Sequence, residues 1–96
     1  MKYIISYDIG ESKIRDEFSH FLISNNFIRI QKSIFLGEII DTDLLEKIMN
    51  YHSFFSDEKN SLLIFPLSFE NFSKSYFFGK TFDLDLFEQF KDFIIF

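Results

Sequence analysis

Residues 3–9, Tyr-Ile-Ile-Ser-Tyr-Asp-Ile, decide how the rest of the chain is interpreted. Ile and Tyr favour β-strands, and together with Lys2 this run predicts a strand over residues 2–9. Its one acidic residue, Asp8, falls near the end of that strand. An acid there would lie at the edge of a sheet, where it could hold a metal ion, although an aspartate that ends a strand is also a common turn former.

Helical and extended patterns follow in turn along the first half of the chain. Apolar residues recur at helical spacing from residue 12 to residue 24, with Ser12 as the expected N-cap and Asn25-Asn26 as the stop. Residues 27–40 then alternate as a strand does. Because these fourteen residues exceed a typical strand, we predict a break near Lys32-Ser33.

A second helix and a further strand are predicted after residue 40. The helix runs from a cap at Asp41 or Thr42 to about Phe55, and residues 61–67 form the strand. That strand is apolar on both sets of alternate positions, so both faces of the sheet should be covered there. One layer of helices covers one face only. A homodimer packed sheet to sheet is the simplest way to cover the other face.

The C-terminal part is less regular. Residues 76–79 are expected to form a short strand and residues 84–91 a short helix. The four apolar residues 93–96 would be an aggregation liability if left bare, so we expect them to add as a strand to a sheet edge, in the same subunit or in a partner. The whole order is the ferredoxin-like β-α-β-β-α-β arrangement of the α+β class. We predict a single domain over residues 1–96, in which residues 81–96 are a C-terminal extension.

Composition limits the chemistry that the chain can perform. Its 96 residues with 47% hydrophobic content suffice for one compact domain. Cysteine is absent, which excludes disulfides, thiolate metal sites and cysteine nucleophiles, so the metal chemistry left is carboxylate chemistry. The net charge of −5, without a basic half, argues against strong autonomous nucleic-acid binding. No signal peptide or membrane-length apolar run is visible, so a cytoplasmic protein without a membrane partner is expected.

Asp8 is the strongest candidate for a catalytic or metal-binding residue. Mg²⁺ prefers oxygen ligands and often needs only one or two carboxylates plus a phosphate of the substrate. A single aspartate per chain is too few, but two Asp8 carboxylates could share one ion in a C2 dimer whose axis passes near the end of the first strand. Such an ion would polarise a phosphodiester and activate a water for attack.

Three basic residues are candidates for nucleic-acid contacts. Arg15, Arg29 and Lys32 are plausible phosphate contacts if they share a face with Asp8, and ordinary solvated charges otherwise. The three glycines stand alone, so no glycine-rich phosphate loop exists. The remaining candidates are expected to have structural roles, on helix faces or as helix caps: His20, His52, Asp83 and Asp85.

Several segments, read in order, resemble the CRISPR-associated protein 2 family, which is the small subunit of the spacer-acquisition machinery. They are Tyr7-Asp8-Ile9, the Gln-Lys-Ser-Ile-Phe-Leu-Gly-Glu of residues 31–38, and the Ser-Leu-Leu-Ile-Phe-Pro-Leu of residues 61–67, with Arg15 between the first two. The resemblance spans about residues 1–80, and the terminal Phe-Ile-Ile-Phe resembles the swapped strand that ends members of the family.

This resemblance implies a fold, an activity and partners. The fold is a ferredoxin-like homodimer with a metal-dependent phosphodiesterase centre at the subunit interface, in which Asp8 is the ligand of Mg²⁺ or Mn²⁺. The partner is the integrase subunit of the same system, and the protein is mainly a scaffold that spaces integrase dimers along incoming DNA. Members of the family have been assigned cleavage of single-stranded RNA or of double-stranded DNA, and some show neither.

The chain departs from the family pattern in one segment. The usual Asp-Ser-Val-Arg-Ile-Tyr-Pro-Leu reads Asn-Ser-Leu-Leu-Ile-Phe-Pro-Leu over residues 60–67, so Leu63 replaces an arginine and Phe65 lacks a tyrosine hydroxyl. The basic cluster often found around Arg15 is also thinner. Both differences weaken phosphate binding and independent catalysis, so the resemblance favours the scaffold role over the endonuclease role.

Two other interpretations remain open at this point. The VapD-type ribonuclease toxins resemble the same fold, with a similar aspartate at a strand end and a Gln-x-Ser segment. A ferredoxin-like small-molecule-sensing module would instead have a ligand pocket between subunits and no dependence on Asp8 or a metal. The Phe-Pro-Leu segment of residues 65–67 and the apolar terminal strand favour the CRISPR interpretation.

Overall fold

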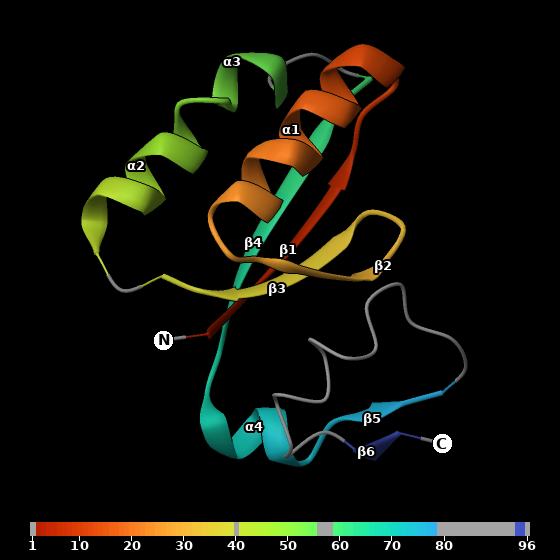
Figure 1. The fold of residues 1–96 in the computed structure, drawn as a ribbon, viewed down its shortest axis with the longest axis vertical. Helices are drawn as coiled ribbons and strands as arrows, with labels where there is room; N and C mark the ends of the chain where they lie inside the picture. Colours follow the sequence, from red (N-terminus) through yellow and green to blue (C-terminus); the bar gives the residue numbers. More distant parts are fainter. Residues whose placement is uncertain (1, 40, 56–58, 79–93, 96) are drawn as a thin grey trace.

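A four-stranded antiparallel sheet lies at the centre of the computed structural model, which describes residues 2–39, 41–55, 59–78 and 94–95 (Figure 1). Its strands are β1 (Lys2–Asp8), β2 (Ile28–Gln31), β3 (Ile34–Glu38) and β4 (Ser61–Leu67). Their spatial order is β2-β3-β1-β4, and each neighbouring pair is antiparallel. Helical segments follow β1 and β3, which gives two split β-α-β units. The predicted α+β class and β-α-β-β-α-β order are therefore confirmed.

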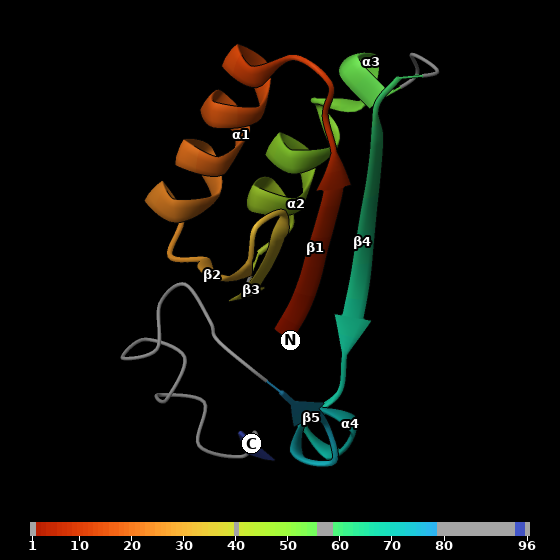
Figure 2. The same ribbon diagram turned by 90° about the vertical axis from the view of Figure 1, so that its right-hand side faces the viewer.

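Three helices cover one face of this sheet. When the sheet is viewed edge-on, α1 (Ser12–Ser24), α2 (Thr42–Met49) and α3 (His52–Phe55) lie on the same side (Figure 2). The short helix α4 (Phe69–Ser73) follows β4 and lies beyond one end of the sheet. Near it, β5 (Tyr76–Phe77) pairs in parallel with β6 (Ile94–Ile95) in a separate two-stranded sheet.

The predicted N-cap of α1 was wrong by one residue. The N-cap of α1 is Glu11 rather than Ser12, since Glu11 has extended backbone angles and its carbonyl already accepts the Arg15 N–H at 3.0 Å. At the other end the prediction is confirmed, because Asn25 caps the helix and Asn26 has a positive φ of 67°.

The second predicted helix is in fact two. Its start at Asp41 is confirmed, because the carboxylate of Asp41 accepts the Leu44 N–H at 2.9 Å. Helix α2 ends at Met49, where the Tyr51 N–H donates to the Ile48 carbonyl at 3.1 Å, and α3 begins at His52. The helical periodicity of the apolar residues continues across this break, so the sequence pattern did not reveal it.

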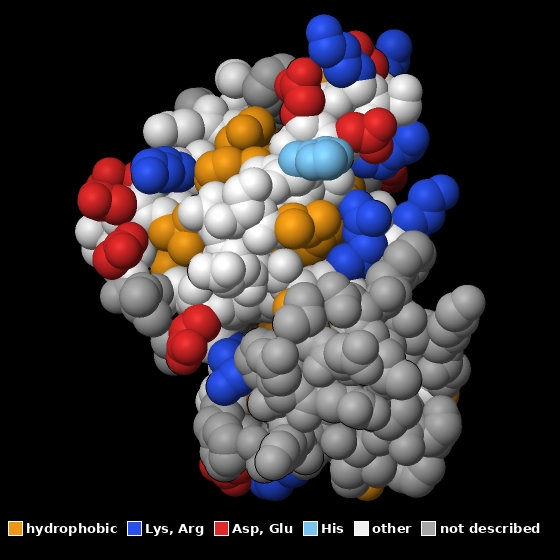
Figure 3. Space-filling model, in the orientation of Figure 1, with side chains coloured by type: hydrophobic (Ala, Val, Ile, Leu, Met, Phe, Trp, Pro, Cys, Tyr) orange, Lys and Arg blue, Asp and Glu red, His pale blue; other side chains and the backbone are white. Residues whose placement is uncertain are grey.

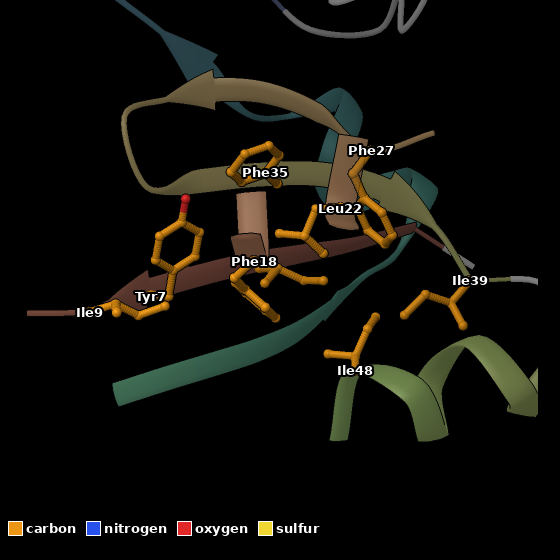
Figure 4. Close-up of a cluster of buried hydrophobic side chains, with 9 residues drawn as sticks. Tyr7, Ile9, Phe18, Leu22, Phe27, Phe35, Ile39 and Ile48 are labelled. Atoms are coloured by element: carbon orange, nitrogen blue, oxygen red, sulfur yellow. The ribbon is translucent and has the colours of Figure 1, made fainter. Parts of the chain in front are cut away.

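Each face of the sheet has its own cluster of buried residues. On the helix side these are Ile5, Tyr7, Ile9, Phe18, Leu22, Phe27, Phe35, Ile39 and Ile48 (Figure 4). On the other side they are Ile28, Ile30, Leu36, Leu67 and Phe72. Phe72 reaches the second cluster from α4, and it is 1% exposed. Among the described residues, it is near α4 that the chain itself covers the second face.

The C-terminal predictions are described only in part. A short strand at residues 76–79 is present as Tyr76–Phe77, and Gly79 lies outside the described residues. Helix α4 was not predicted. The predicted helix at residues 84–91 also lies outside the described residues, as do Phe93 and Phe96. Ile94–Ile95 pairs with β5, while the assignment of residues 81–96 as one extension stays a prediction.

Candidate functional site

Asp8 is the last residue of β1 and is exposed to solvent. It lies opposite Ser61, the first residue of β4, in the antiparallel register. Just beyond, the Gly10 N–H donates to the Asn60 side-chain oxygen at 3.0 Å. This bond ties the segment after β1 to the start of β4, so Asp8 projects from a fixed strand end rather than from a loose loop.

Asp8 belongs to the face of the sheet that the three helices leave open. Side chains alternate along a strand, and its neighbour Tyr7 packs in the helix-side core. Cross-strand partners share a face, and the partners of Ser6 and Ile4 are Leu63 and Phe65.

Leu63 is 57% exposed and Phe65 is 49% exposed. Together with Ile4, which is partly buried, they form an apolar strip that leads along the sheet toward Asp8, and we call these three residues the open strip. Leu63 and Phe65, where the family pattern has an arginine and a tyrosine, therefore both lie on the face that carries Asp8.

The donor set of Asp8 fits a hard divalent cation only if a second chain contributes. Within the described part of one chain, no group of three or more His, Cys, Asp or Glu residues could hold a metal ion. One exposed carboxylate is a suitable but incomplete ligand for Mg²⁺ or Mn²⁺, which accept one or two carboxylates and complete their shell with water and substrate oxygens. Two symmetry-related Asp8 side chains would meet that need.

The three predicted basic contacts lie together, at the edge where α1 begins and β2 turns into β3. Arg15, Arg29 and Lys32 line one pocket of about 170 Å³, together with Tyr7 and Asp16. Lys and Arg side chains gather along this edge of the helix-covered face in the space-filling view (Figure 3). The sequence analysis named them as separate candidates for phosphate contacts. The structure brings them into one site, which we call the basic pocket.

The basic pocket and Asp8 do not share a face of the sheet. The Arg29 guanidinium carbon lies 5.0 Å from the ring centre of Phe35, which is buried in the helix-side core, and Tyr7 lines the pocket from the same core. The carboxylate of Asp8 alternates to the opposite side. The condition under which these cations and Asp8 would act on one phosphate is therefore not met within a single chain.

Sequence reasoning missed Tyr7 as a site residue. Tyr7 is only 5% exposed, and its buried hydroxyl oxygen has no hydrogen-bond partner. Nothing in the sequence announces an unpaired hydroxyl. The alternation of side chains along β1 places Tyr7 and Asp8 on opposite faces of the sheet.

Of the other four candidates, His20 alone has a side chain that the structure describes. His20 is exposed on α1, and its backbone carbonyl accepts the Ser24 hydroxyl at 2.8 Å, in keeping with a helix-face role. The side chain of His52 and all of Asp83 and Asp85 lie outside the described residues.

A larger hollow of about 530 Å³ lies near the start of α2. It lies away from both Asp8 and the basic pocket, and its Asp41 carboxylate is already used as the cap of α2. Size alone therefore gives this hollow no functional role.

Comparison with known proteins agrees with this arrangement. The family described as CRISPR associated protein Cas2 matches residues 1–75. Five chains of solved structures also match. One is the crystal structure of a hypothetical protein TT1823 from Thermus thermophilus, with 26% sequence identity, a TM-score of 0.58, and coverage of 70% of this chain and 80% of that one.

A search of the curated proteins found no match. Among the described residues, no helix has the length and apolar character needed to cross a membrane. The family match covers both Asp8 and the segment of residues 60–67, and from it we conclude that this chain belongs to the Cas2 family of CRISPR-associated proteins.

Proposed function

We propose that the protein is the homodimeric scaffold subunit of a CRISPR spacer-acquisition complex, acting in the cytoplasm with the integrase subunit and DNA. The family links the chain to CRISPR systems. The observation that carries the scaffold role is the open strip, which leaves Leu63 and Phe65 half exposed beside Asp8. An exposed apolar strip on a sheet face suits permanent association with a second surface.

A second copy of the chain is the proposed occupant of the open strip. In a C2 dimer the open strips of the two copies would meet, so each of their apolar side chains would be buried in both copies. Removing apolar surface from water is the main favourable term in association. Because Leu63 stands where the family usually has an arginine, this chain gains apolar contact there and loses a positive charge near Asp8.

Such a dimer would also bring the two Asp8 carboxylates toward its axis. We propose Asp8 as the ligand of a shared Mg²⁺ or Mn²⁺ and as the catalytic residue of any endonuclease activity that the protein has. When bound, the ion would polarise a phosphodiester and activate a water. The protein's part is to present the carboxylates from fixed strand ends, which the Gly10 to Asn60 hydrogen bond supports.

Arg15, Arg29 and Lys32 are the proposed contacts to nucleic-acid phosphates. They gather in the basic pocket although the chain as a whole has a net charge of −5. A local cluster of this kind supports binding that positions DNA within a larger complex, since the surrounding charge opposes strong binding by the subunit alone.

The scaffold role is tested by pull-down and spacer integration with the neighbouring integrase subunit. We expect the wild type and Asp8→Ala to capture the integrase and support integration equally, because scaffolding needs the surface and not the carboxylate. Asp43→Ala is the matched control, since it removes an exposed carboxylate from the first turn of α2, away from Asp8. Failure of all three proteins to bind the integrase would contradict the scaffold role and favour the toxin-like alternative.

The endonuclease role needs a separate assay with single-stranded RNA and with duplex DNA. If Asp8 carries chemistry, the purified dimer cuts one of them with Mg²⁺ or Mn²⁺, Asp8→Ala abolishes cutting, and Asp43→Ala does not. Equal cutting by wild type and Asp8→Ala would indicate a contaminant. No cutting by any of the proteins, together with normal integration, would leave the protein a scaffold alone.

A further inference from the structure

The hydroxyl of Tyr7 is an unpaired hydrogen-bonding group inside the protein. Its oxygen is buried and has no partner, and Tyr7 lines the basic pocket. The ring extends from β1 with its oxygen toward the turn between β2 and β3 (Figure 4). Buried polar groups are nearly always paired, so an unpaired hydroxyl on a residue that lines a pocket indicates a missing partner from a ligand.

The charges around this hydroxyl select the kind of ligand. Arg15, Arg29 and Lys32 contribute three positive charges and Asp16 one negative charge, and three minus one leaves the pocket at +2 in a chain of net charge −5. A phenol hydroxyl can donate to an oxygen of an anion. The volume of about 170 Å³ exceeds several times the roughly 30 Å³ that one water occupies, so the pocket has room for a tetrahedral anion with some of its water.

Phe35 helps to hold two of these groups in place. Its ring is stacked against that of Tyr7, with ring centres 6.0 Å apart and planes at 22°, and the Arg29 guanidinium carbon lies 5.0 Å from the same ring. The position of the Tyr7 hydroxyl is fixed further by an edge-to-face contact with Phe18 at 5.2 Å. A site whose donors are set by a packed core loses little conformational freedom when a ligand binds.

We propose that the basic pocket seats a single phosphate group, one oxygen of which accepts a hydrogen bond from the Tyr7 hydroxyl. This seat lies on the helix-covered side of the sheet and works without Asp8, which projects from the opposite side. The proposal deepens the nucleic-acid role proposed for Arg15, Arg29 and Lys32, and it rests on that role only for the source of the phosphate. The source is either free inorganic phosphate or the terminal phosphate of a nucleic-acid strand.

The test is a calorimetric titration of the protein with inorganic phosphate at constant ionic strength. Tyr7→Phe keeps the ring and its packing while removing the donor, and we expect the Kd for phosphate to rise about tenfold or more, as for a lost hydrogen bond to a charged group. Tyr3→Phe is the matched control, because Tyr3 lies on the same strand and packs against the same core without lining the pocket. It should leave the Kd unchanged.

Thermal unfolding of the same variants separates binding from folding. Without phosphate, Tyr7→Phe should unfold at the wild-type temperature or above, because it removes an unpaired buried hydroxyl. Equal phosphate affinity of the wild type and Tyr7→Phe would overturn the proposal. If Tyr7→Phe unfolds early, Lys32→Gln takes its place, since Lys32 is exposed in a turn, and an unchanged Kd in that variant would also overturn it.

Short single strands with and without a 5′-phosphate then identify the source. Preference of the wild type for the phosphorylated strand, lost in Tyr7→Phe, would support the seat with a terminal phosphate as its ligand. Binding of inorganic phosphate without such a preference would support the seat with free phosphate. Failure of the scaffold proposal would show as lost integrase binding with phosphate affinity intact, so the two proposals fail in different assays.

Discussion

The two sides of the sheet differ most where Tyr7 and Asp8 stand next to each other on β1. Tyr7 faces a closed aromatic core under α1 and α3, whereas Asp8 faces the open strip of Ile4, Leu63 and Phe65. One strand thus contributes to the interior of the chain with one set of residues and to its surface with the other. The odd positions of β1 thus serve folding, and in the proposed dimer the even positions would serve association.

The closed side holds the monomer together through Phe18. Its ring is fully buried and lies within 5.0–5.6 Å, centre to centre, of the rings of Tyr7, Tyr51 and Phe55. Edge-to-face aromatic pairs contribute about 0.5–1.5 kcal/mol each beyond the burial of their surface. These contacts connect Phe18 of α1 to β1, to α3 and to Tyr51 between α2 and α3, so this one side chain joins β1 to the helix layer.

The largest effect is therefore expected from Phe18→Ala, which should lower the free energy of unfolding by about 3–5 kcal/mol through the cavity it leaves. Denaturant unfolding at a low protein concentration measures this. Phe65→Ala is the matched control on the open side, where the ring is 49% exposed and the cost to the monomer should be much smaller. Similar losses in the two variants would contradict the division between the sides.

The next effect is expected on association. Leu63→Asp should raise the dissociation constant of the dimer about a hundredfold, since the loss of about 1.5 kcal/mol of apolar burial counts once in each copy. Sedimentation across a concentration series measures the constant. The control is Ile23→Asp, which places the same charge at a comparably exposed apolar position on α1, with 52% exposure against 57%. Equal weakening by both would show that the open strip is not the interface.

Most of the fold could be predicted from local patterns. The start of α2 at Asp41, the end of α1 at Asn25, and the break between β2 and β3 all follow from side-chain chemistry or length that a single segment contains. The gap between α2 and α3 could not be predicted, because tertiary packing of Tyr51 against Phe18 competes there with an unbroken helical pattern.

The candidate site could be predicted only as separate residues. Asp8, Arg15, Arg29 and Lys32 were identified because of their types and positions. Three of them meet in one pocket because the turn after β2 comes back to the start of α1, which is a property of the assembled sheet. The unpaired hydroxyl of Tyr7 depends on the placement of every neighbouring side chain, so no sequence signal could have shown it.

A smaller loss is expected from Gly37→Ala on β3, which tests how tightly the closed side is packed. A Cβ at Gly37 would overlap the ring of Phe27, a buried member of the helix-side core. We expect a loss of about 1–3 kcal/mol in the free energy of unfolding, as for other overpacked cores. The matched control is Gly10→Ala, whose Cβ would meet no atom closer than 4.0 Å, and it should be nearly neutral. An unchanged free energy of unfolding in Gly37→Ala would mean that the Phe27 ring can move aside, so the helix-side core is less tightly packed than its burial indicates.

The smallest effect is expected from Asp8→Asn, and its sign is informative. The side chain is exposed, so the monomer should change by no more than about 0.5 kcal/mol. With EDTA present, two like charges near the dimer axis repel each other by up to about 1 kcal/mol, so the variant should form a slightly tighter dimer than the wild type.

Addition of Mg²⁺ should reverse that order, because an ion held by two carboxylates strengthens the wild-type dimer and leaves Asp8→Asn unchanged. The measurement is the same concentration series with and without the metal, and Asp43→Asn is the charge-matched control. A wild-type dimer that does not respond to Mg²⁺ would show that the two Asp8 carboxylates hold no common ion. The open side would then serve association alone, and nucleic-acid chemistry would have to be sought at the basic pocket on the closed side.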